Sequence, residues 1–335
     1  MSCAKESWMK ILVRMPNWLG DGVMATPFLQ TLQAHFPNAQ LILVAPASVC
    51  ALLEREGGYS LVVDHTKSAK NRLLATYKLA KSLAPCDLAF ALTNNFYSAL
   101  LLYWSGAPIR IGYAKNLRSF LLTHALQFQN THQVLSYYNL LSPLIDPLPA
   151  APALKLSAKP FDLQTNRKAI GLSPGAAFGS SKRWEAAYFT QVARHFLEQG
   201  HAIYFLGAPS DQELIQEIIQ PLGAHPNLYN LCGQTTLHAL IDTIASLDLF
   251  IANDSGPMHM ASALQTPLIA LFGPTIPLVG KPWQHPKARS LFKNLPCSPC
   301  KKRTCPIKNG GPIEPHACMV RITPQEVINM ANALL

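Results

Sequence analysis

Hydrophobic residues in this chain follow two spacings in turn, and the alternation occurs twice along the sequence. Ile11–Arg14 is a short apolar run, and a glycine-containing segment follows it. From there to Leu32 the apolar residues recur at helical spacing, and a second apolar run occupies Leu41–Pro46. The same order of strand, loop, helix and strand begins again near Ala169. This alternation is typical of βαβ units, which build a parallel sheet.

Further apolar runs extend both repeats, at residues 87–92, 109–113, 248–253 and 267–273. A segment rich in proline and alanine, Ser142–Asp162, separates the repeats and is the expected linker. We therefore predict an α/β protein with two doubly wound domains, residues 1–160 and 161–335, that face each other across a cleft. In such sheets ligands bind beyond the carboxyl ends of the strands.

The last helix is predicted to begin at Thr323. This residue suits the N-cap, Pro324 suits the first helical position, and Glu326 completes a capping box. The helix belongs to the second domain along the chain and is a candidate for packing back onto the first.

Composition adds a folded core and a preference for anionic partners. The chain has 335 residues, of which 49% are hydrophobic and 14% charged, the opposite of a disordered composition. Its formal net charge of +10 favours nucleic acid, a phosphorylated sugar or an anionic membrane face, although a generic basic surface gives the same value. The N-terminal segment lacks a signal peptide's apolar core, and no apolar run approaches the about 20 residues of a membrane span. We expect a cytoplasmic protein.

The first glycine-containing loop, "NWLGDG", holds one acid, Asp21. Gly20, Gly22 and Ala25 match a dinucleotide fingerprint, but in that fingerprint the first glycine follows the strand directly. Here four residues intervene, and the second strand lacks the terminal acid that would hold a ribose, so a nicotinamide site is disfavoured. Asp21 has two interpretations that can coexist, a general base and a helix N-cap.

A loop of the second domain, "SPGAAFGSSKRW" (residues 173–184), suits a phosphate or diphosphate. Its small residues let a ligand approach backbone N–H groups, and the next helix presents its positive N-terminus. Lys182 and Arg183 add positive charge. The alternative is an ordinary loop with a solvated basic pair.

A second loop, "ANDSGPMHMASAL" (residues 252–264), forms a turn at Asp254, Ser255 and Gly256 before a helix. The N–H groups at this helix start would meet an anion, and His259 lies early in the helix. The alternative is a histidine packed against the sheet. Two anion-binding helix starts in one domain favour a nucleotide diphosphate over a single phosphate.

Four of the eight cysteines form a pattern in the C-terminal part, at Cys297, Cys300, Cys305 and Cys318. A C-x2-C pair with two later cysteines can bind zinc, and the adjacent Lys-Lys-Arg suggests a nucleic-acid module. The spacing misses the paired C-x2-C pattern, however. Structural zinc, reduced thiols and disulfides formed after purification are the three interpretations, and we assign no metal ligand.

Together these segments resemble the ADP-heptose:lipopolysaccharide heptosyltransferases over nearly the whole chain. The resemblance rests on "NWLGDGVMATPFLQTL", "TNNFYSALLLYWSGAPIRIGY", "SPGAAFGSSKRW", "NDSGPMHMASAL", "ALFGPT" and the "CSPC…CP…CM" tail. Within the family it favours heptosyltransferase II, the subtype that adds the second heptose of the inner core. It implies the GT-B architecture of two Rossmann-like domains, an ADP-heptose donor bound by the second domain, and no required metal or other cofactor.

The resemblance also implies site residues. It implies an inverting transfer with Asp21 as the general base. The positions that match the family's donor site are Lys182, Asp211, Thr235, Asp254, Ser255, Gly256 and His259. The acceptor, heptosyl-Kdo2-lipid A or its elongated form, would be bound mainly by the first domain, at Asn17, Asn94, Arg110 and Arg118. Many relatives carry a basic residue where Tyr97 stands, and some carry hydroxyl residues where Ala176–Phe178 stand.

An acceptor of this kind would place the protein at the cytoplasmic face of the Gram-negative inner membrane, in outer-membrane biogenesis. Two alternatives use the same scaffold: heptosyltransferase I, acting on Kdo2-lipid A, and a nucleotide-sugar epimerase. A nucleic-acid binder is a third alternative, but the nucleotide-type loops argue against it. The sequence does not fix the acceptor's decoration, the donor epimer or the oligomeric state.

Overall fold

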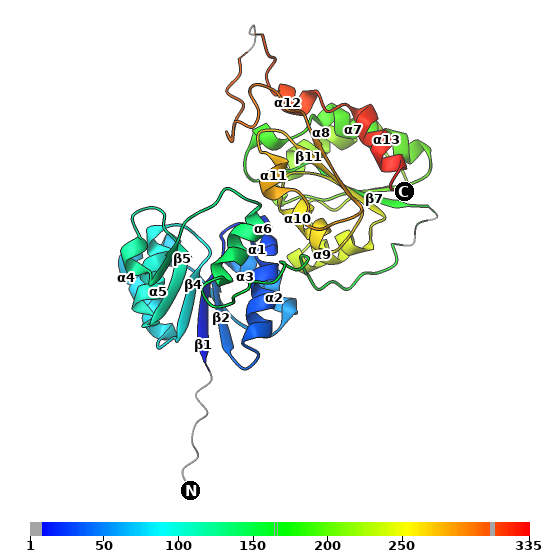
Figure 1. Cartoon of the computed structure of the whole chain (residues 1–335). Coiled ribbons are helices and arrows are strands. Elements are labelled where there is room, and N and C mark those ends of the chain that lie inside the picture. Colours follow the sequence, from blue (N-terminus) through cyan, green and yellow to red (C-terminus); the bar gives the residue numbers. More distant parts are fainter. Residues whose placement is uncertain (1–8, 164, 166, 309–311) are drawn as a thin grey trace. The chain divides into compact units, whose positions relative to one another are not determined.

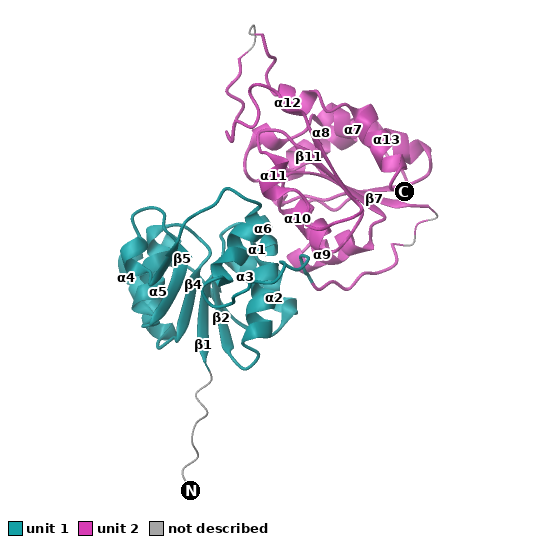
Figure 2. Cartoon of the chain, viewed as in Figure 1, with its two compact units in different colours: residues 1–156 teal, residues 157–335 magenta. Residues whose placement is uncertain are grey.

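A computed structural model describes residues 9–163, 165, 167–308 and 312–335, and the chain divides into two compact units (Figures 1 and 2). Unit 1 is Met1–Leu156 and unit 2 is Ser157–Leu335. The division falls inside the expected Pro- and Ala-rich linker, slightly before residue 160. Residues 1–8, on which the expected absence of a signal peptide partly rests, lie outside the described residues.

Unit 1 contains, within its described residues, a six-stranded parallel sheet in the order β3-β2-β1-β4-β5-β6. The strands are β1 (Lys10–Arg14), β2 (Gln40–Ala45), β3 (Tyr59–Val63), β4 (Leu88–Ala91), β5 (Ile109–Tyr113) and β6 (His124–Leu126). The α-helices are α1 (Leu19–Met24), α2 (Thr26–His35), α3 (Ala47–Leu53), α4 (Arg72–Leu83), α5 (Phe96–Trp104) and α6 (Gln133–Tyr138). Short 3-10 helices are η1 (Glu54–Glu56), η2 (Thr66–Ser68), η3 (Ser119–Leu121) and η4 (Asn139–Leu141).

The strand β1 is buried on both faces at the centre of this sheet. Ile11, Leu12 and Val13 are fully buried because helices lie on both sides of the sheet (Figure 1). On one side, Phe28 of α2 packs edge-to-face on Phe90 of β4, with 5.0 Å between the ring centroids. The chain changes direction across the sheet between β1 and β4, which creates the switch point where such sheets bind ligands.

Unit 2 repeats this topology in its described residues, with six parallel strands in the order β12-β11-β10-β7-β8-β9. They are β7 (Ala169–Ser173), β8 (Ala202–Phe205), β9 (Leu228–Asn230), β10 (Leu249–Asn253), β11 (Leu268–Phe272) and β12 (Ala288–Phe292). The α-helices are α7 (Ala186–Glu198), α8 (Gln212–Ile219), α9 (Leu237–Ser246), α10 (Gly256–Ala263), α11 (Pro277–Gly280), α12 (Ala317–Val320) and α13 (Pro324–Asn332). Short 3-10 helices are η5 (Ser180–Lys182), η6 (Pro209–Asp211) and η7 (Gln220–Leu222). The switch point here lies between β7 and β10, and both sheets confirm the predicted doubly wound fold.

The last helix, α13, begins as predicted but packs on its own unit. The Glu326 N–H donates to Thr323 Oγ1 at 3.3 Å, and the Thr323 N–H donates to the Glu326 carboxylate at 2.9 Å, which completes the capping box. The buried side chains of Val327, Ile328 and Ala331 belong to the unit 2 core, where the helix contacts α7 and β11. The apolar face of α13 is therefore covered within unit 2, and its packing onto the first domain stays a prediction.

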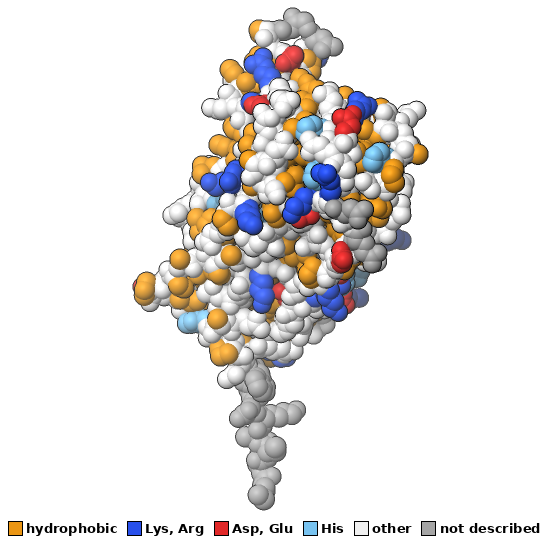
Figure 3. All heavy atoms as spheres, turned by 90° about the vertical axis from the view of Figure 1, so that its right-hand side faces the viewer, with side chains coloured by type: hydrophobic (Ala, Val, Ile, Leu, Met, Phe, Trp, Pro, Cys, Tyr) orange, Lys and Arg blue, Asp and Glu red, His pale blue; other side chains and the backbone are white. Residues whose placement is uncertain are grey.

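The described helices include none that is both long enough and apolar enough to cross a membrane. On the face drawn in Figure 3, lysine and arginine side chains are interspersed with apolar and uncharged ones. On this face the basic side chains are thus mixed with uncharged ones, and the face by itself does not indicate where an anionic partner binds.

Candidate functional site

Asp21 lies inside a helix, although the sequence suggested a flexible turn. The N-cap of α1 is Trp18, so Asp21 is the third helical residue and its prediction as an N-cap is wrong. Gly20 and Gly22 are also helical and buried. A Cβ on Gly22 would lie 3.1 Å from a methyl carbon of Val49, so this glycine lets α1 pack closely on α3. The half-buried Asp21 carboxylate is held by helix packing at the edge where β1 ends.

Tyr137 of α6 orients the Asp21 carboxylate. Its hydroxyl donates a hydrogen bond to Asp21 Oδ1 at 2.8 Å, and its side chain is buried. Burial, followed by the charge of Asp21 and the hydrogen bond to it, raises the pKa of Tyr137 well above its ordinary value. The phenol therefore remains a donor at neutral pH. A carboxylate oriented in this way is suited to accept a proton from a substrate hydroxyl.

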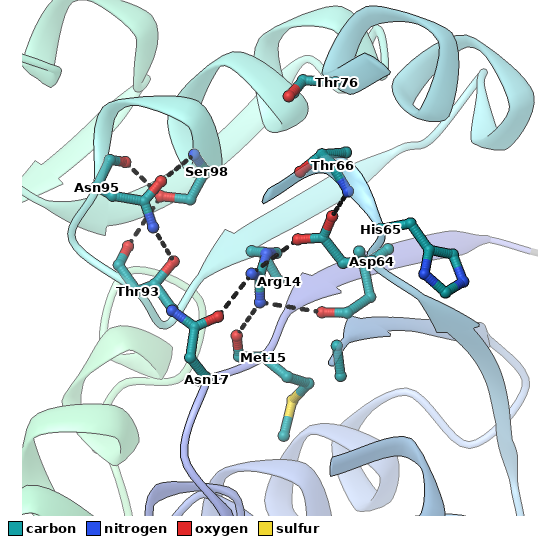
Figure 4. A network of polar contacts seen from close by, with 12 residues as sticks. Arg14, Met15, Asn17, Asp64, His65, Thr66, Thr76, Thr93, Asn95 and Ser98 are labelled. Carbon is teal, nitrogen blue, oxygen red and sulfur yellow. Dashed lines mark hydrogen bonds and ion pairs between the residues drawn. The ribbon is translucent and has the colours of Figure 1, made fainter. Parts of the chain in front are cut away.

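An ion pair that the sequence analysis missed lies beside this helix, at the carboxyl ends of β1 and β3 (Figure 4). Arg14 Nη2 lies 2.8 Å from Asp64 Oδ2, and the two side chains are 7% and 6% exposed. Arg14 also donates to Asn17 Oδ1 at 2.8 Å and to the Met15 carbonyl. The Thr66 N–H donates to Asp64 Oδ1 at 2.8 Å. The ion pair thereby fixes the segment that carries Asn17.

Opposing effects set the pKa of Asp64. Burial alone would raise this pKa, but hydrogen bonds from Thr66 and the charge of Arg14 outweigh burial and lower it. Burial is the largest cause that lowers the pKa of Arg14, although a guanidinium remains charged at neutral pH. Arg14 was detectable from the sequence as a charge in an apolar run. Its partner was not, because only the strand order brings residue 64 to residue 14.

Arg118 has a structural role inside unit 1, which corrects its assignment to the acceptor. Its side chain is fully buried and donates to Asn94 Oδ1 at 2.8 Å, to Ser98 Oγ at 2.8 Å and to the Tyr113 carbonyl at 3.1 Å. Burial lowers its pKa to about 10. Arg118 therefore holds the loop after β4 against the segment after β5, and any effect on a ligand passes through Asn94.

The other predicted acceptor residues differ in how available they are. Asn17 is exposed after β1, and Asn94 is half-buried after β4, so both lie at the switch point of the unit 1 sheet. Arg110 is half-buried and donates from Nε to the Leu121 carbonyl at 2.8 Å and from Nη1 to the Ala107 carbonyl at 2.6 Å. Arg110 also pairs with Ala89 at the start of β5, the edge of the sheet opposite to Asn17 and Asn94, so the structure does not bring it together with them.

Arg72 is a cation that the sequence analysis did not select. A small cavity at this edge is lined by Arg14, Asp64, Arg72, Asn95 and Tyr97, among others. The Arg72 guanidinium lies 4.0 Å from the centroid of the Tyr97 ring. Among the described residues its buried Nε has no hydrogen-bond partner. Arg72 therefore brings positive charge to the face of the Tyr97 ring at this edge.

In unit 2, the two predicted anion-binding loops meet at Asp254, which follows β10. Lys182 Nζ lies 2.5 Å from Asp254 Oδ2, and both side chains are about nine-tenths buried, at 12% and 10% exposed. The Thr275 hydroxyl donates to the same oxygen at 2.5 Å. Thr275 belongs to the "FGPT" segment after β11, so three loops at one edge of the sheet converge on one carboxylate. Lys182 and Asp254, which were both expected in the donor site, therefore lie in contact.

Asn253 holds the predicted donor loop, residues 173–184, at both of its ends. This last residue of β10 is fully buried, and its Nδ2 donates to the Pro174 carbonyl at 2.7 Å. Its Oδ1 accepts from the Trp184 N–H at 3.2 Å. The Trp184 indole is buried and donates to the Ile322 carbonyl at 2.8 Å. The loop that presents Lys182 is therefore held at both ends, and no sequence pattern predicts these contacts.

The helix α10 begins at Gly256, with Ser255 as its N-cap. The Ser255 hydroxyl oxygen is buried and has no hydrogen-bond partner among the described residues. His259 lies in the first turn and is 5% exposed, so the predicted helix position is confirmed and the side chain is buried. The helix start thus offers a hydroxyl and backbone N–H groups to an anionic ligand.

Asp211 and Thr235 lie on the loops after β8 and β9. The Asp211 carboxylate accepts from the Ala208 N–H at 3.1 Å and lies 3.6 Å from Arg183 Nη2, beside Lys182. Thr235 is half-buried just before α9. Its segment is tied to the segment of Asp211 because the Gly233 N–H donates to the Gly207 carbonyl at 3.0 Å. These loops meet at the edge that carries Lys182.

The cysteine segment supports the donor loop through its backbone. The Arg303 carbonyl accepts from the Ser181 N–H at 3.1 Å, and the Lys302 carbonyl accepts from the Ser181 hydroxyl at 2.5 Å. Gly179 has φ 155°, and a Cβ on it would lie 2.2 Å from the Arg303 carbonyl oxygen. Residues 302 and 303 therefore support this loop, and no sequence pattern predicts the contact.

All four cysteines of the pattern are thiols in the structure. Burial, followed by the neighbouring Cys297, Cys300 and Cys305, raises the pKa of Cys318 to about 11. No three His, Cys, Asp or Glu side chains in the described part of the chain are arranged to hold a metal ion. The four cysteines are thus neighbours in space, but their side chains do not form a coordination site as they stand.

Comparisons with known proteins agree on one family. The model described as glycosyltransferase family 9 (heptosyltransferase) matches residues 76–310. Lipooligosaccharide heptosyltransferase 2 of Campylobacter jejuni is 37% identical over 98% of each chain. Lipopolysaccharide heptosyltransferase 2 of Escherichia coli K12 is 32% identical over 98% of this chain and 99% of that one. The solved structure of E. coli ADP-heptose LPS heptosyltransferase II matches with a TM-score of 0.79 and 30% identity, over 97% of this chain and 98% of that one.

Proposed function

The chain belongs to glycosyltransferase family 9, the heptosyltransferase family, and we propose that it adds the second heptose of the lipopolysaccharide inner core. The donor is ADP-heptose, with the heptose in the L-glycero-D-manno form, and the acceptor is the first heptose of heptosyl-Kdo2-lipid A. The observation that carries this proposal is the near-full-length similarity to proteins named heptosyltransferase 2. The two Rossmann-like sheets agree with the predicted GT-B fold.

The donor binds to unit 2 in this proposal. Lys182 contacts the diphosphate, and the Ser255 hydroxyl and the Gly256 N–H at the start of α10 complete the anion site. These groups support the assignment because a buried lysine and a helix N-terminus both favour negative charge. His259 lies next to the sugar. The loops of Asp211 and Thr235 line the ribose and adenine.

Asp21 acts as the general base. The acceptor hydroxyl oxygen forms a bond to the anomeric carbon of the heptose while its proton passes to the Asp21 carboxylate. The bond from that carbon to the β-phosphate oxygen breaks, and ADP leaves with the electron pair. Attack opposite the leaving group inverts the anomeric centre. The hydrogen bond from Tyr137 supports this role because it orients the base. Lys182 and the start of α10 stabilise the charge on the departing diphosphate.

The acceptor binds to unit 1, at the edge that carries Asn17 and Asn94. Its Kdo carboxylates and lipid A phosphates are anionic, and Arg72 supplies positive charge at this edge. Arg118 supports Asn94 from behind. We place the enzyme at the cytoplasmic face of the inner membrane, because the acceptor is there. The transfer requires neither a metal nor another cofactor, and no nucleic acid takes part.

A transfer assay tests the proposal with ADP-heptose and three acceptors that carry zero, one or two heptoses. We expect a single heptose to be added to the one-heptose acceptor and little to Kdo2-lipid A, as read by mass spectrometry. Efficient transfer to Kdo2-lipid A would reassign the enzyme to the first heptose. Isomerisation of ADP-heptose without any acceptor would make it an epimerase.

A further inference from the structure

The turn after β5 exposes large apolar side chains beside the proposed acceptor edge. Asn116 and Leu117 have left-handed backbone, with φ of 55° and 52°, and Leu117 is 90% exposed. Phe120 in η3 is 74% exposed. Its ring centroid lies 6.3 Å from that of Phe96, which begins α5 and is 39% exposed. We call Phe96, Leu117 and Phe120 the apolar edge patch.

The residues between the exposed ones are firmly anchored. Arg118, between Leu117 and Phe120, is fully buried and makes the hydrogen bonds described above. Leu121 and Leu122 are also buried, at 6% and 8% exposed. The turn is thus held by its inward-facing residues while Leu117 and Phe120 face solvent. Fixed exposure of large apolar side chains marks an interaction surface.

Charge around the patch selects the partner. Lys67, Lys70 and Arg72 lie between β3 and the first residue of α4, and Lys115 follows β5, so all four lie at the carboxyl edge of the sheet. The sequence between Asp64 and Asp146 holds a single acid, Asp87. Asp87 precedes β4 and so lies at the opposite edge of the sheet. The Arg72 guanidinium lies over the Tyr97 ring, and that ring lies 6.5 Å from the Phe96 ring. The patch is therefore apolar, with a basic surround.

We propose that the apolar edge patch docks unit 1 on an anionic membrane surface. The three side chains enter the boundary between headgroups and acyl chains, and basic residues meet the headgroups: Lys67, Lys70, Arg72 and Lys115. Apolar burial combined with positive charge is the pairing that gives interfacial binding. A second copy of the chain is a poorer partner, because a two-fold contact would bring two basic surrounds together.

The docking surface is joined to the proposed acceptor loop. Asn116 Nδ2 donates to the Asn94 carbonyl at 2.6 Å, and Arg118 Nη2 donates to Asn94 Oδ1 at 2.8 Å. Membrane contact at the patch would therefore hold the loop after β4 near the lipid headgroups. The inference rests on the proposed function only for the nature of the acceptor, since vesicle binding itself requires no substrate.

Vesicle sedimentation of the full-length protein tests the inference. We expect binding to vesicles of phosphatidylethanolamine with phosphatidylglycerol and weak binding to phosphatidylcholine alone. The double variant Leu117→Ser, Phe120→Ser should lose binding by roughly tenfold or more, because two large apolar side chains no longer insert. The matched control is Leu278→Ser in α11, which removes an apolar side chain that is 59% exposed in unit 2 and should bind like the wild type.

Activity separates docking from folding and from the proposed function. The double variant should transfer heptose to a de-acylated, water-soluble acceptor at the wild-type rate and slow only on vesicle-embedded acceptor. A wild type that binds vesicles but transfers no heptose would refute the proposed function alone. A wild type that transfers heptose but ignores anionic vesicles would refute docking alone, as would a double variant that still binds them. If the wild type forms dimers and the double variant does not, the patch binds a second copy of the chain instead of a membrane.

A second variant does not depend on loss of binding. Phe120→Trp should shift its fluorescence to the blue when anionic vesicles are added, because the indole leaves water. Leu278→Trp is the matched control and should not shift. An unchanged spectrum for Phe120→Trp in protein that sediments with the vesicles would overturn the proposed orientation.

Discussion

Asp254 is a carboxylate within a site proposed to bind a diphosphate, where its charge alone would repel the donor. In the structure its Oδ2 lies 2.5 Å from Lys182 Nζ and accepts from the Thr275 hydroxyl at 2.5 Å. The carboxylate is thus occupied by a cation and a hydroxyl, and it fixes the position of the lysine. We interpret Asp254 as acting on the diphosphate mainly through Lys182.

The Lys182→Ala variant tests this interpretation. The change removes the cation and leaves Asp254 facing the phosphates. The binding free energy of ADP should therefore weaken by about 1.5–3 kcal/mol, the value of a hydrogen bond to a charged group. Isothermal titration calorimetry measures the loss. The double variant Lys182→Ala, Asp254→Asn should recover part of it, because the repulsion is removed. ADP affinity equal to the wild type in the single variant would exclude Lys182 from the site.

Tyr137→Phe tests the positioning of the base. Phenylalanine fills nearly the same volume but cannot donate to Asp21 Oδ1, so the carboxylate loses its orientation. We expect turnover to fall roughly tenfold while the dissociation constant for ADP-heptose stays constant, because Tyr137 belongs to unit 1. Equal loss in donor affinity and turnover would point to a general defect in folding instead.

At the scale of elements, the Arg14–Asp64 pair joins the ends of β1 and β3, which are not neighbours in the sheet. Asp64→Asn leaves the buried guanidinium without its counter-charge. The unfolding free energy of unit 1 should fall by about 3–5 kcal/mol at pH 7, the usual cost of breaking a buried pair. This free energy is measured by chemical denaturation, with hydrogen exchange of the β1 amides as the probe. Unchanged stability at pH 7 would show that the pair contributes nothing.

The same pair predicts a pH dependence. The pKa of Asp64 is lower in the folded chain than its ordinary value of 3.8, so protonation favours unfolding. The stabilisation is complete above that ordinary value and is lost as the pH falls through the lower folded value. The difference in unfolding free energy between the wild type and Asp64→Asn should therefore become smaller below about pH 4.

Gly179 tests the support that the cysteine segment gives to the donor loop. In Gly179→Ala the new Cβ would lie 2.2 Å from the Arg303 carbonyl oxygen and would push the two segments apart. We expect ADP affinity to fall several-fold, because Lys182 is carried by this loop. Gly223→Ala is the control, with φ 68° and nothing within 4 Å of the added carbon. Comparable loss in both variants would trace the effect to backbone strain.

Elements with strong hydrophobic patterns were predicted correctly, and short ones were not. The central strands and their order of repetition followed from apolar runs, since these strands are buried on both faces. The four edge strands β3, β6, β9 and β12 were missed because exposed and half-buried residues interrupt their apolar pattern. Helix α1 was taken for a turn because its two glycines suggest flexibility, whereas close packing on α3 is their use.

The candidate site was predictable where a loop follows a strand. Lys182, Asp254 and the helix start at Gly256 met as expected, because parallel strands end at one edge. Contacts between distant segments were not predictable. Arg118 looked like a surface cation, but the loop after β4 folds over it and buries it. Asn253 and Thr275 have no sequence pattern that reveals their partners.

At the scale of the whole molecule, two sheets of the same topology carry different chemistry. Unit 1 supplies a carboxylate held by Tyr137, and unit 2 supplies a lysine and a helix N-terminus for an anion. Both groups follow strands that flank the switch point of their sheet. In the proposed function this division separates the binding of the donor, in unit 2, from the proton transfer to Asp21, in unit 1.

The role of Asp21 as the general base is tested by measuring single-turnover transfer in the Asp21→Asn variant, with the donor bound beforehand. Asparagine is nearly isosteric and its amide oxygen still accepts from Tyr137, so the fold should persist, but the side chain cannot take a proton at neutral pH. The account predicts an ADP-heptose dissociation constant equal to the wild type and a transfer rate lower by ~10²–10⁴, the usual contribution of a general base. Normal donor binding with a near-wild-type single-turnover rate would contradict it.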